Sequence, residues 1–588
     1  MSITVVRSVD GLRPAEGHLR VAAAQYGVGT DVDANLATAL RFIDAAAAEG
    51  AQVVVLPEFG NHVSWYADRA HARAMAVRLD GPYAKALADS AAQQGIWLMA
   101  NVVVAQEDGR TTGTNLLFSP QGELVATSDK QVLMGSERLH LDDAIGNGPV
   151  VTTPVARFGM YSCMDGVINE TPRGLAVRGA QVLLNSLNSF ALDEASLHIP
   201  VRAPENRVWI VAANKVGALV PPGAIEQVSA AVGVSVERLY GAGESQVVAP
   251  DGTVVAMAPR DVDALVIADI DVARADDKRR PDGTDVMSAR RPEIYGPLGA
   301  EPRGRVAPAG AEQVAVVVLQ LARDGAEAID DAALRVREAV ASGAALVVLP
   351  ELYCFDGGVI PTSLSRSDAA HRAHVAVASL ADALHGTDAL VVTSLPGELG
   401  DAVSHDAVLV GSEGVLARQP QLHRVERHAH WVGALGDTQA VHVTPFGRLA
   451  LVVGDDAIYP ETFRLAALAD ADVVALPFTV LEAWETTTGL VERSGENRLV
   501  VVAATRPSGA GTSVVCDLPH DFTLWSPHWS APFAGVISHP EVLRAEAGPS
   551  ALHAVVHPAE AVNRLVSRGT DLVDGRPWAL LRDTVLAR

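Results

Sequence analysis

The chain alternates between short, continuous apolar runs and longer segments whose apolar residues follow helical spacing. The runs 21–25 (VAAAQ) and 51–56 (AQVVVL) predict buried strands, and 35–49 between them predicts a helix with Leu36, Leu40 and Ile43 on one face. This alternation indicates an α/β fold with mixed sheets covered by helices. Further expected elements are a helix at 84–94, a strand at 97–104, and a hairpin made of 115–118 and 123–127.

The same order of elements recurs about 290 residues later. The segment 345–351 (ALVVLPE) repeats 52–58 (QVVVLPE), and the GTD triplet at 569–571 repeats that at 283–285. Such regular recurrence indicates a tandem duplication.

The stretch 296–312 is rich in Gly, Pro and Ala and lacks apolar periodicity, so it suits a linker. A chain of 588 residues also exceeds what one hydrophobic core usually serves. We therefore expect two domains, residues 1–300 and 301–588.

Cys163 stands at the end of the apolar run 155–161 and before a segment with helical spacing, which places it on a strand-to-helix turn. The first N–H groups of a helix favour a thiolate and any oxyanion beside it. A buried structural cysteine is the alternative for such a residue.

Charge and composition exclude several classes of protein. The net charge is −24 and the longest basic cluster is Lys278-Arg279-Arg280, so nucleic acid and anionic membranes are unlikely partners. Three cysteines form no disulfide framework, and neither a signal peptide nor a membrane span is expected. The chain reads as a cytoplasmic protein. Only four lysines occur, at 85, 130, 215 and 278, so a lysine can mark a need for an ammonium group.

Glu58, Lys130 and Cys163 each lie at the end of a strand or just after one. Together they would supply a base, a cation that stabilises an oxyanion, and a nucleophile. That set is sufficient for acyl transfer.

The order of these motifs resembles the nitrilase, or carbon-nitrogen hydrolase, superfamily. The resemblance rests on VVVLPE, on a lysine after a hairpin (Asn115, Gly122, Lys130), on FGxxxCxD with Glu170 seven residues after the cysteine, and on ENR at 205–207. It implies two tandem nitrilase-like α-β-β-α sandwich domains.

For the first domain the resemblance implies a catalytic triad of Glu58, Lys130 and Cys163. Cys163 attacks an amide carbonyl, Lys130 and the Met164 N–H stabilise the oxyanion, and Glu58 activates the water that hydrolyses the thioester. Glu137 is similar to a second glutamate that positions substrate in the family, and a solvated loop residue is its alternative. Asp165 is expected to be structural, because a carboxylate there can cap exposed N–H groups.

The substrate is expected to be a small linear amide or carbamoyl compound, with no metal or cofactor. Met164-Asp165 follows Cys163 where nitrile-hydrolysing members commonly have Trp-Glu, which favours an amide over a nitrile. Asn188 and Tyr66 are candidate substrate-binding residues in the stretches 185–190 and 59–66. Residues 219–240 resemble an insertion with a short amphipathic helix, a candidate lid.

The second domain is expected to be catalytically inactive. It keeps Glu351, but Gly454 replaces the cysteine and Gln421 stands near the place of the lysine. The histidines 423, 428 and 430 have no cysteine pair nearby, which disfavours a zinc site. Since family members associate through one helical face, we expect an intramolecular pseudo-dimer of the two domains, with further homo-oligomers an open possibility.

Two other functions stay open at the level of sequence. One is a non-catalytic protein that binds a metabolite or acts as a scaffold, suggested by the degenerate second domain. The other is a thioester-based acyltransferase or a nitrilase, since the thioester is shared and only the second nucleophile or the substrate differs.

Overall fold

The computed structural model describes residues 3–8, 17–526 and 529–587. The expectation that the chain has no signal peptide concerns its N-terminus, where residues 1–2 and 9–16 lie outside the described residues. The chain divides into two compact units. Unit 1 comprises the described residues of Met1–Asp277, Asp521–Ser538 and Leu565–Ala587, and unit 2 comprises Lys278–His520 and His539–Arg564.

These units do not coincide with the contiguous ranges 1–300 and 301–588. The difference arises because late segments of the second range bury their apolar residues in unit 1. Val566 and Leu572, for example, belong to one apolar cluster with Val132 and Met164.

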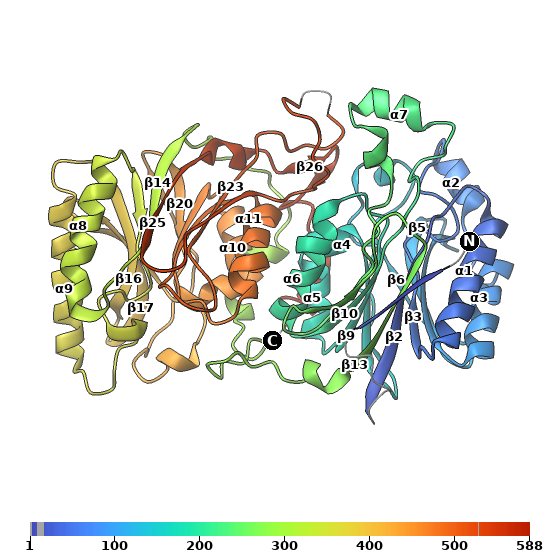
Figure 1. The fold of residues 1–588 in the computed structure, drawn as a ribbon, viewed down its shortest axis with the longest axis horizontal. Coiled ribbons are helices and arrows are strands. Elements are labelled where there is room, and N and C mark those ends of the chain that lie inside the picture. Colours follow the sequence, from blue (N-terminus) through green and yellow to red (C-terminus); the bar gives the residue numbers. More distant parts are fainter. Residues whose placement is uncertain (1–2, 9–16, 527–528, 588) are drawn as a thin grey trace. The chain divides into compact units, whose positions relative to one another are not determined.

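The first sheet of unit 1 has seven strands in the order β1-β13-β2-β3-β4-β5-β6. Helices α1 (Val32–Ala48) and α3 (Pro82–Gln94) cover one of its faces, where Phe42 and Leu87 pack on Ala22 and Val54 (Figure 1). Its strands are β1 (Thr4–Arg7), β2 (His18–Gln25), β3 (Val53–Val55), β4 (Trp97–Ala105), β5 (Thr111–Phe118), β6 (Leu124–Asp129) and β13 (Ala264–Asp271).

The second sheet of unit 1 has six strands in the order β12-β11-β10-β9-β8-β7 and packs on the first through Val21, Phe158 and Leu184. Helices α5 (Glu170–Val177) and α6 (Ile199–Asn206) lie on its other side. Unit 1 is therefore an α-β-β-α sandwich. The strands are β7 (Val151–Thr152), β8 (Arg157–Ser162), β9 (Val182–Ser186), β10 (Trp209–Ala213), β11 (Gln246–Val248) and β12 (Val254–Met257); α2 (Arg69–Met75), α4 (Met164–Val167) and α7 (Ile225–Val232) are shorter helices.

Unit 2 repeats this design, with sheets in the order β18-β17-β16-β15-β14-β25 and β19-β20-β21-β22-β23-β24. Helices α8 (Ala328–Ala341) and α9 (Arg366–Ala383) cover the first sheet, and α10 (Pro460–Leu468) and α11 (Leu490–Asn497) the second. The strands are β14 (Val314–Gln320), β15 (Leu346–Val348), β16 (Leu390–Leu399), β17 (Ala402–Gly411), β18 (Gly414–Pro420), β19 (Val441–Thr444), β20 (Gly447–Leu451), β21 (Val473–Pro477), β22 (Val500–Ala504), β23 (Val514–Asp517), β24 (Glu541–Arg544) and β25 (Ser550–Val556). A separate ribbon of β26 (Leu565–Ser567) and β27 (Thr570–Asp571) belongs to unit 1.

Local sequence signals explain where the early helices begin and end. Asp31 caps α1 by accepting the N–H groups of Asp33 and Ala34, and α3 begins at Pro82 and ends before Gly95 at φ +65°. The expected strands, helices and hairpin of the first half are confirmed, with ends shifted by a few residues. Within the described residues, no helix has both the length and the apolar character needed to cross a membrane.

Candidate active site

Glu58 lies two residues beyond Leu56, where β3 has ended, and its side chain is fully buried. The turn is fixed by two hydrogen bonds: the Glu58 N–H donates to the Leu187 carbonyl (3.2 Å), and the Phe59 N–H donates to Asn101 Oδ1 (2.9 Å). Phe59 has a φ of +49°, which a bulky residue adopts only when its surroundings impose it. The backbone therefore holds the Glu58 carboxylate in a defined position inside unit 1.

Lys130 follows β6 and joins two carboxylates. Its Nζ lies 2.8 Å from Glu58 Oε1 and 2.9 Å from Glu137 Oε2. Glu137 Oε2 also accepts the Met134 N–H at 2.9 Å, which closes the loop between Lys130 and Glu137. The side chains of Lys130 and Glu58 are fully buried, whereas Glu137 is partly exposed, so the ion pair of Lys130 and Glu58 is desolvated.

Cys163 occupies the turn between β8 and α4 with a φ of +47° and a ψ of −109°. Its N–H donates to the Ser186 carbonyl (3.0 Å), which fixes this turn at the end of β9. The expected strand-to-helix turn is confirmed, although α4 has only four residues. A non-glycine residue at this φ is strained, and strain of this kind is common at functional sites.

Asp165 connects the cysteine turn to the lysine loop. Its Oδ1 accepts the N–H groups of Gln131 (3.0 Å) and Val132 (2.8 Å), and its Oδ2 accepts the Ser162 N–H at 3.2 Å. The structural role expected for this carboxylate is confirmed. Burial raises its pKa to about 7, although the Lys130 charge opposes the shift.

The pKa values show how burial and charge act on the group. Burial raises the pKa of Glu58 to about 7 against the opposing charge of Lys130. Burial, followed by the charge of Glu58, raises the pKa of the Cys163 thiol well above its ordinary value. Burial lowers the pKa of Lys130, but Glu137 and Glu58 outweigh it and the pKa stands well above the ordinary value. Burial thus favours the thiol form of Cys163, the two glutamates favour the charged form of Lys130, and Glu58 titrates near neutral pH.

Lys215 is a second buried lysine near this group that the sequence analysis did not single out. It lies two residues beyond Ala213, the last residue of β10, and its Nζ donates to the Phe59 carbonyl at 3.4 Å. The Phe59 ring lies 5.3 Å from Lys130 Nζ and 5.8 Å from Lys215 Nζ, so both lysine nitrogens approach the same ring. Burial lowers the pKa of Lys215 to about 7, against the charges of Glu58 and Cys163. Its place after a strand and the scarcity of lysine were the available signals.

Two of the candidate substrate-binding residues, Met164 and Tyr66, lie close to the same group. Met164 begins α4, so its N–H precedes the first intrahelical hydrogen bond and is free to meet an oxyanion. Tyr66 packs with Phe59 and Leu133, and its buried hydroxyl has no hydrogen-bond partner among the described residues. The same holds for Asn188 Oδ1. Unpaired buried polar atoms are candidates for ligand contacts.

In unit 2 the corresponding place is occupied by a network of fixed charges. Glu351 takes the place of Glu58, and Arg427 Nη2 lies 2.9 and 2.8 Å from its two carboxylate oxygens. The same nitrogen lies 2.6 Å from Asp455, which also pairs with Arg280. Burial would raise the pKa of Glu351, but Arg427 and His428 hold it well below the ordinary value.

Gly454 replaces the cysteine and has a φ of +53°, close to that of Cys163. A Cβ at Gly454 would lie 2.4 Å from Glu351 Oε1, so the carboxylate occupies the space of a side chain. The hollow beside Gly454 has a volume of about 10 Å³, which is at the lower limit for one water molecule.

Glu351, His405 and His428 form a group whose ligand atoms all lie within 4.8 Å of one another, which metal binding requires. His405 was missed because it lies within β17, far in sequence from His428. Burial lowers its pKa to about 3, so it is neutral, as a metal ligand must be. However, Arg427 Nη2 already contacts both oxygens of this carboxylate. The other histidines of the cluster point elsewhere: His423 bonds Asp456 and His430 bonds the Ile360 carbonyl.

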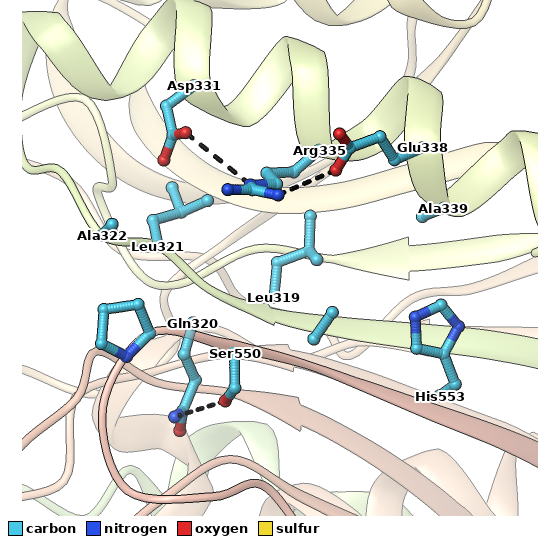
Figure 2. Close-up of a pocket in the computed structure, with 12 residues that line it drawn as sticks. Leu319, Gln320, Leu321, Ala322, Asp331, Arg335, Glu338, Ala339, Ser550 and His553 are labelled. Carbon is cyan, nitrogen blue, oxygen red and sulfur yellow. Dashed lines mark hydrogen bonds and ion pairs between the residues drawn. The ribbon is translucent and has the colours of Figure 1, made fainter.

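A pocket of about 260 Å³ lies on the first sheet of unit 2, between α8 and the ends of β14 and β25 (Figure 2). Arg335 lies between Asp331 and Glu338, and Gln320 donates to Ser550 (Figure 2). The drawn charged groups are paired with one another, and none of the residues discussed above lines this pocket.

An α-β-β-α sandwich with a Glu, Lys and Cys at the strand ends defines a nitrilase-type protein. The family model for carbon-nitrogen hydrolases matches residues 20–280 and 306–525, more than half of the chain. The chain belongs to the carbon-nitrogen hydrolase family, and the tandem repeat is confirmed.

Relatives match about one half of the chain. A nitrilase of Pyrococcus abyssi is 27% identical over 266 residues, which cover 45% of this chain and 93% of the relative. An omega-amidase of Danio rerio is 27% identical over 289 residues, which cover 47% of this chain and 96% of the relative. Among solved structures, an amidase from Nesterenkonia sp. AN1 is similar with 23% identity and a TM-score of 0.39, covering 48% of this chain and 98% of that one.

Proposed function

We propose that unit 1 hydrolyses the carbon-nitrogen bond of a small linear amide or carbamoyl compound through a thioester on Cys163. The observation that carries the proposal is the buried Lys130 ammonium, which lies within 3 Å of both Glu58 and Glu137 and whose charge acts on the Cys163 thiol. Family membership and the amidase and omega-amidase relatives support amide chemistry.

In the first step ionised Glu58 takes the thiol proton as sulfur attacks the carbonyl carbon. The oxyanion lies between the Lys130 ammonium and the Met164 N–H, which replace water as hydrogen-bond donors. When the carbon-nitrogen bond breaks, Glu58 returns the proton to the nitrogen, and ammonia or an amine leaves.

In the second step Glu58 takes a proton from water, which attacks the thioester. The carbon-sulfur bond breaks, the acid leaves and the proton returns to sulfur. A base with a pKa of about 7 suits both steps, because it accepts and returns a proton at neutral pH without a large cost in either direction.

The second sequence copy is catalytically inactive in this proposal. Three observations support this: Gly454 provides no nucleophile, Gln421 provides no ammonium, and the hollow beside Gly454 does not accommodate an amide. Arg427 neutralises Glu351, the retained carboxylate, which removes it as a base.

The test is a panel of linear amides, carbamoyl compounds and nitriles, read by ammonia release and by the intact mass of the protein. We expect an acyl adduct on the wild-type chain, and none on Cys163→Ala, which should also release no ammonia. Cys516→Ala is the matched control, since Cys516 is buried in β23 and should be dispensable for turnover. Turnover by Cys163→Ala would reject the thioester intermediate. Turnover of nitriles alone would reject an amide as the substrate.

A further inference from the structure

Two late segments of the chain, 521–538 and 565–587, pack into unit 1 near Cys163. In the first, 521–538, the N–H groups of Ile537 and Ser538 donate to the buried Asp193 carboxylate at 2.9 and 3.0 Å. The Gly535 carbonyl accepts the Leu192 N–H at 2.8 Å. The segment is therefore fixed to the chain that follows β9.

Apolar contacts extend this attachment to the residue after the cysteine. Met164 belongs to one cluster with Phe522, Leu524 and Ile537 of this segment. The Trp525 ring lies 4.9 Å from the ring of Phe190. The second copy thus covers side chains that border the proposed nucleophile.

The second segment, 565–587, is hydrogen-bonded to the loop between Lys130 and Glu137. Thr570 Oγ1 accepts the Gly135 N–H at 2.9 Å and donates to the Leu133 carbonyl at 3.0 Å. Thr570 is fully buried, so its bond to the Leu133 carbonyl does not compete with solvent, and its bond to the Gly135 N–H is partly buried. Gly135 has a φ of +51°, and a Cβ there would lie 3.1 Å from Ser567 Oγ, so the loop fits closely against this segment.

The same contact occurs in unit 2 with the roles of the copies reversed. Thr284 Oγ1 accepts the Glu426 N–H at 3.0 Å, in the loop that corresponds to 130–138. Thr284 and Thr570 are the central residues of the two GTD triplets. Both units thus share this hydrogen bond between a threonine and the loop. In unit 1, however, the loop carries a lysine paired with two glutamates, and the loop of unit 2 has no lysine.

We propose that Thr570 is a positioning residue for the reaction of unit 1: it holds residues 133–135 so that Lys130 and Glu137 keep their places beside Glu58. Through it, the inactive copy completes the active site of the other copy. This inference rests on the proposed function, and it explains why a copy without nucleophile or ammonium is retained.

The test compares Thr570→Val with Thr284→Val in the full-length chain. Each substitution removes one hydroxyl and the two hydrogen bonds that it makes: Thr570 bonds the Gly135 N–H and the Leu133 carbonyl, and Thr284 bonds the Glu426 N–H and the Asp282 carboxylate. Both substitutions should therefore lower the thermal midpoint by similar amounts. Only Thr570→Val should lower kcat for amide hydrolysis, by roughly 10- to 100-fold, with a much smaller change in KM, because small displacements of catalytic groups have effects of this size. Thr570→Ser keeps the hydroxyl and should restore the wild-type rate.

A second measurement does not depend on amide turnover. The rate of Cys163 alkylation by iodoacetamide, followed against pH by intact mass, reports the charges around the thiol. Thr570→Val should shift this profile and Thr284→Val should not.

If the wild type hydrolyses no compound, the proposed function fails while the alkylation profile still decides the role of Thr570. Equal effects of the two valine variants on rate and profile would overturn the inference. Thr570→Ala removes the same hydroxyl and takes the place of the valine variant if that variant does not fold.

Discussion

Replacing Lys130 by methionine tests the electrostatic reasoning most directly. The ammonium lies 2.8 Å from Glu58 and 2.9 Å from Glu137; Lys130 and Glu58 are fully buried and Glu137 is partly exposed. Methionine has a similar length and no charge, so the variant leaves two carboxylates without a cation. Removing one partner of a buried ion pair costs about 3–5 kcal/mol, and we expect a loss of this size at pH 7.5.

The cost should shrink on acidification, and the sign follows from the direction of the pKa shift. Without Lys130 the pKa of Glu58, already about 7, rises further, so the folded state binds a proton that the unfolded state does not hold above its ordinary pKa near 4.3. The stability of the variant therefore increases as pH falls from 7.5 toward 5. Because a neutral Glu58 no longer needs a cation, the difference from wild type narrows.

The assay is denaturant unfolding at pH 5 and 7.5, combined with amide hydrolysis at pH 7.5. Loss of the oxyanion donor alone should lower kcat by about 10²- to 10³-fold. Lys85→Met is the matched control, because Lys85 is exposed on α3 and should change neither quantity. Equal stability of Lys130→Met and wild type at pH 7.5, with turnover retained, would refute the reasoning.

Three further predictions concern the same charges. The rate of hydrolysis should fall as pH drops below about 7, because Glu58 is then protonated, and a flat kcat/KM profile between pH 5 and 9 would contradict its role as base. Lys215→Met should move this fall in rate to higher pH, because it removes a cation that lowers the pKa of Glu58. A fall at the same pH as in the wild type would contradict an electrostatic coupling between Lys215 and Glu58. Gly454→Cys, made in the Cys163→Ala chain, should lower the thermal midpoint because its Cβ meets the Glu351 carboxylate, and it should release no ammonia; ammonia release would contradict the inference that the missing ammonium and the small hollow also prevent the reaction.

Much of the fold and the core of the site could be predicted because both follow from local pattern. Buried parallel strands are written as continuous apolar runs, and their carboxyl ends meet at one edge of a sheet. Glu58 and Cys163 each follow such a run, and Lys130 follows a hairpin strand. The sequence therefore predicted that these three residues lie in one region of unit 1.

Other features depend on contacts between distant segments and leave little trace in the sequence. Lys215 follows a strand, yet nothing local shows that its side chain reaches the carbonyl of Phe59. His405 lies in the middle of β17, where alternation alone cannot reveal a partner at Glu351. The packing of 521–538 and 565–587 into unit 1 is also invisible to periodicity, although the repeated GTD triplet marked the residue that makes the contact.

The comparison of the two copies separates the scaffold from the chemistry. Gly454 retains the left-handed φ of Cys163, and Asp456 accepts the N–H groups of Leu422 and His423 as Asp165 accepts those of Gln131 and Val132. The turn and its carboxylate cap therefore persist where no nucleophile exists, which means that packing between strand and helix requires them. A buried glutamate cannot remain uncompensated, so the loss of the lysine had to be met by another cation, and Arg427 provides it. The strain at Cys163 is thus a property of the sandwich that the proposed reaction uses, and the side chains placed on that turn decide whether a copy can react.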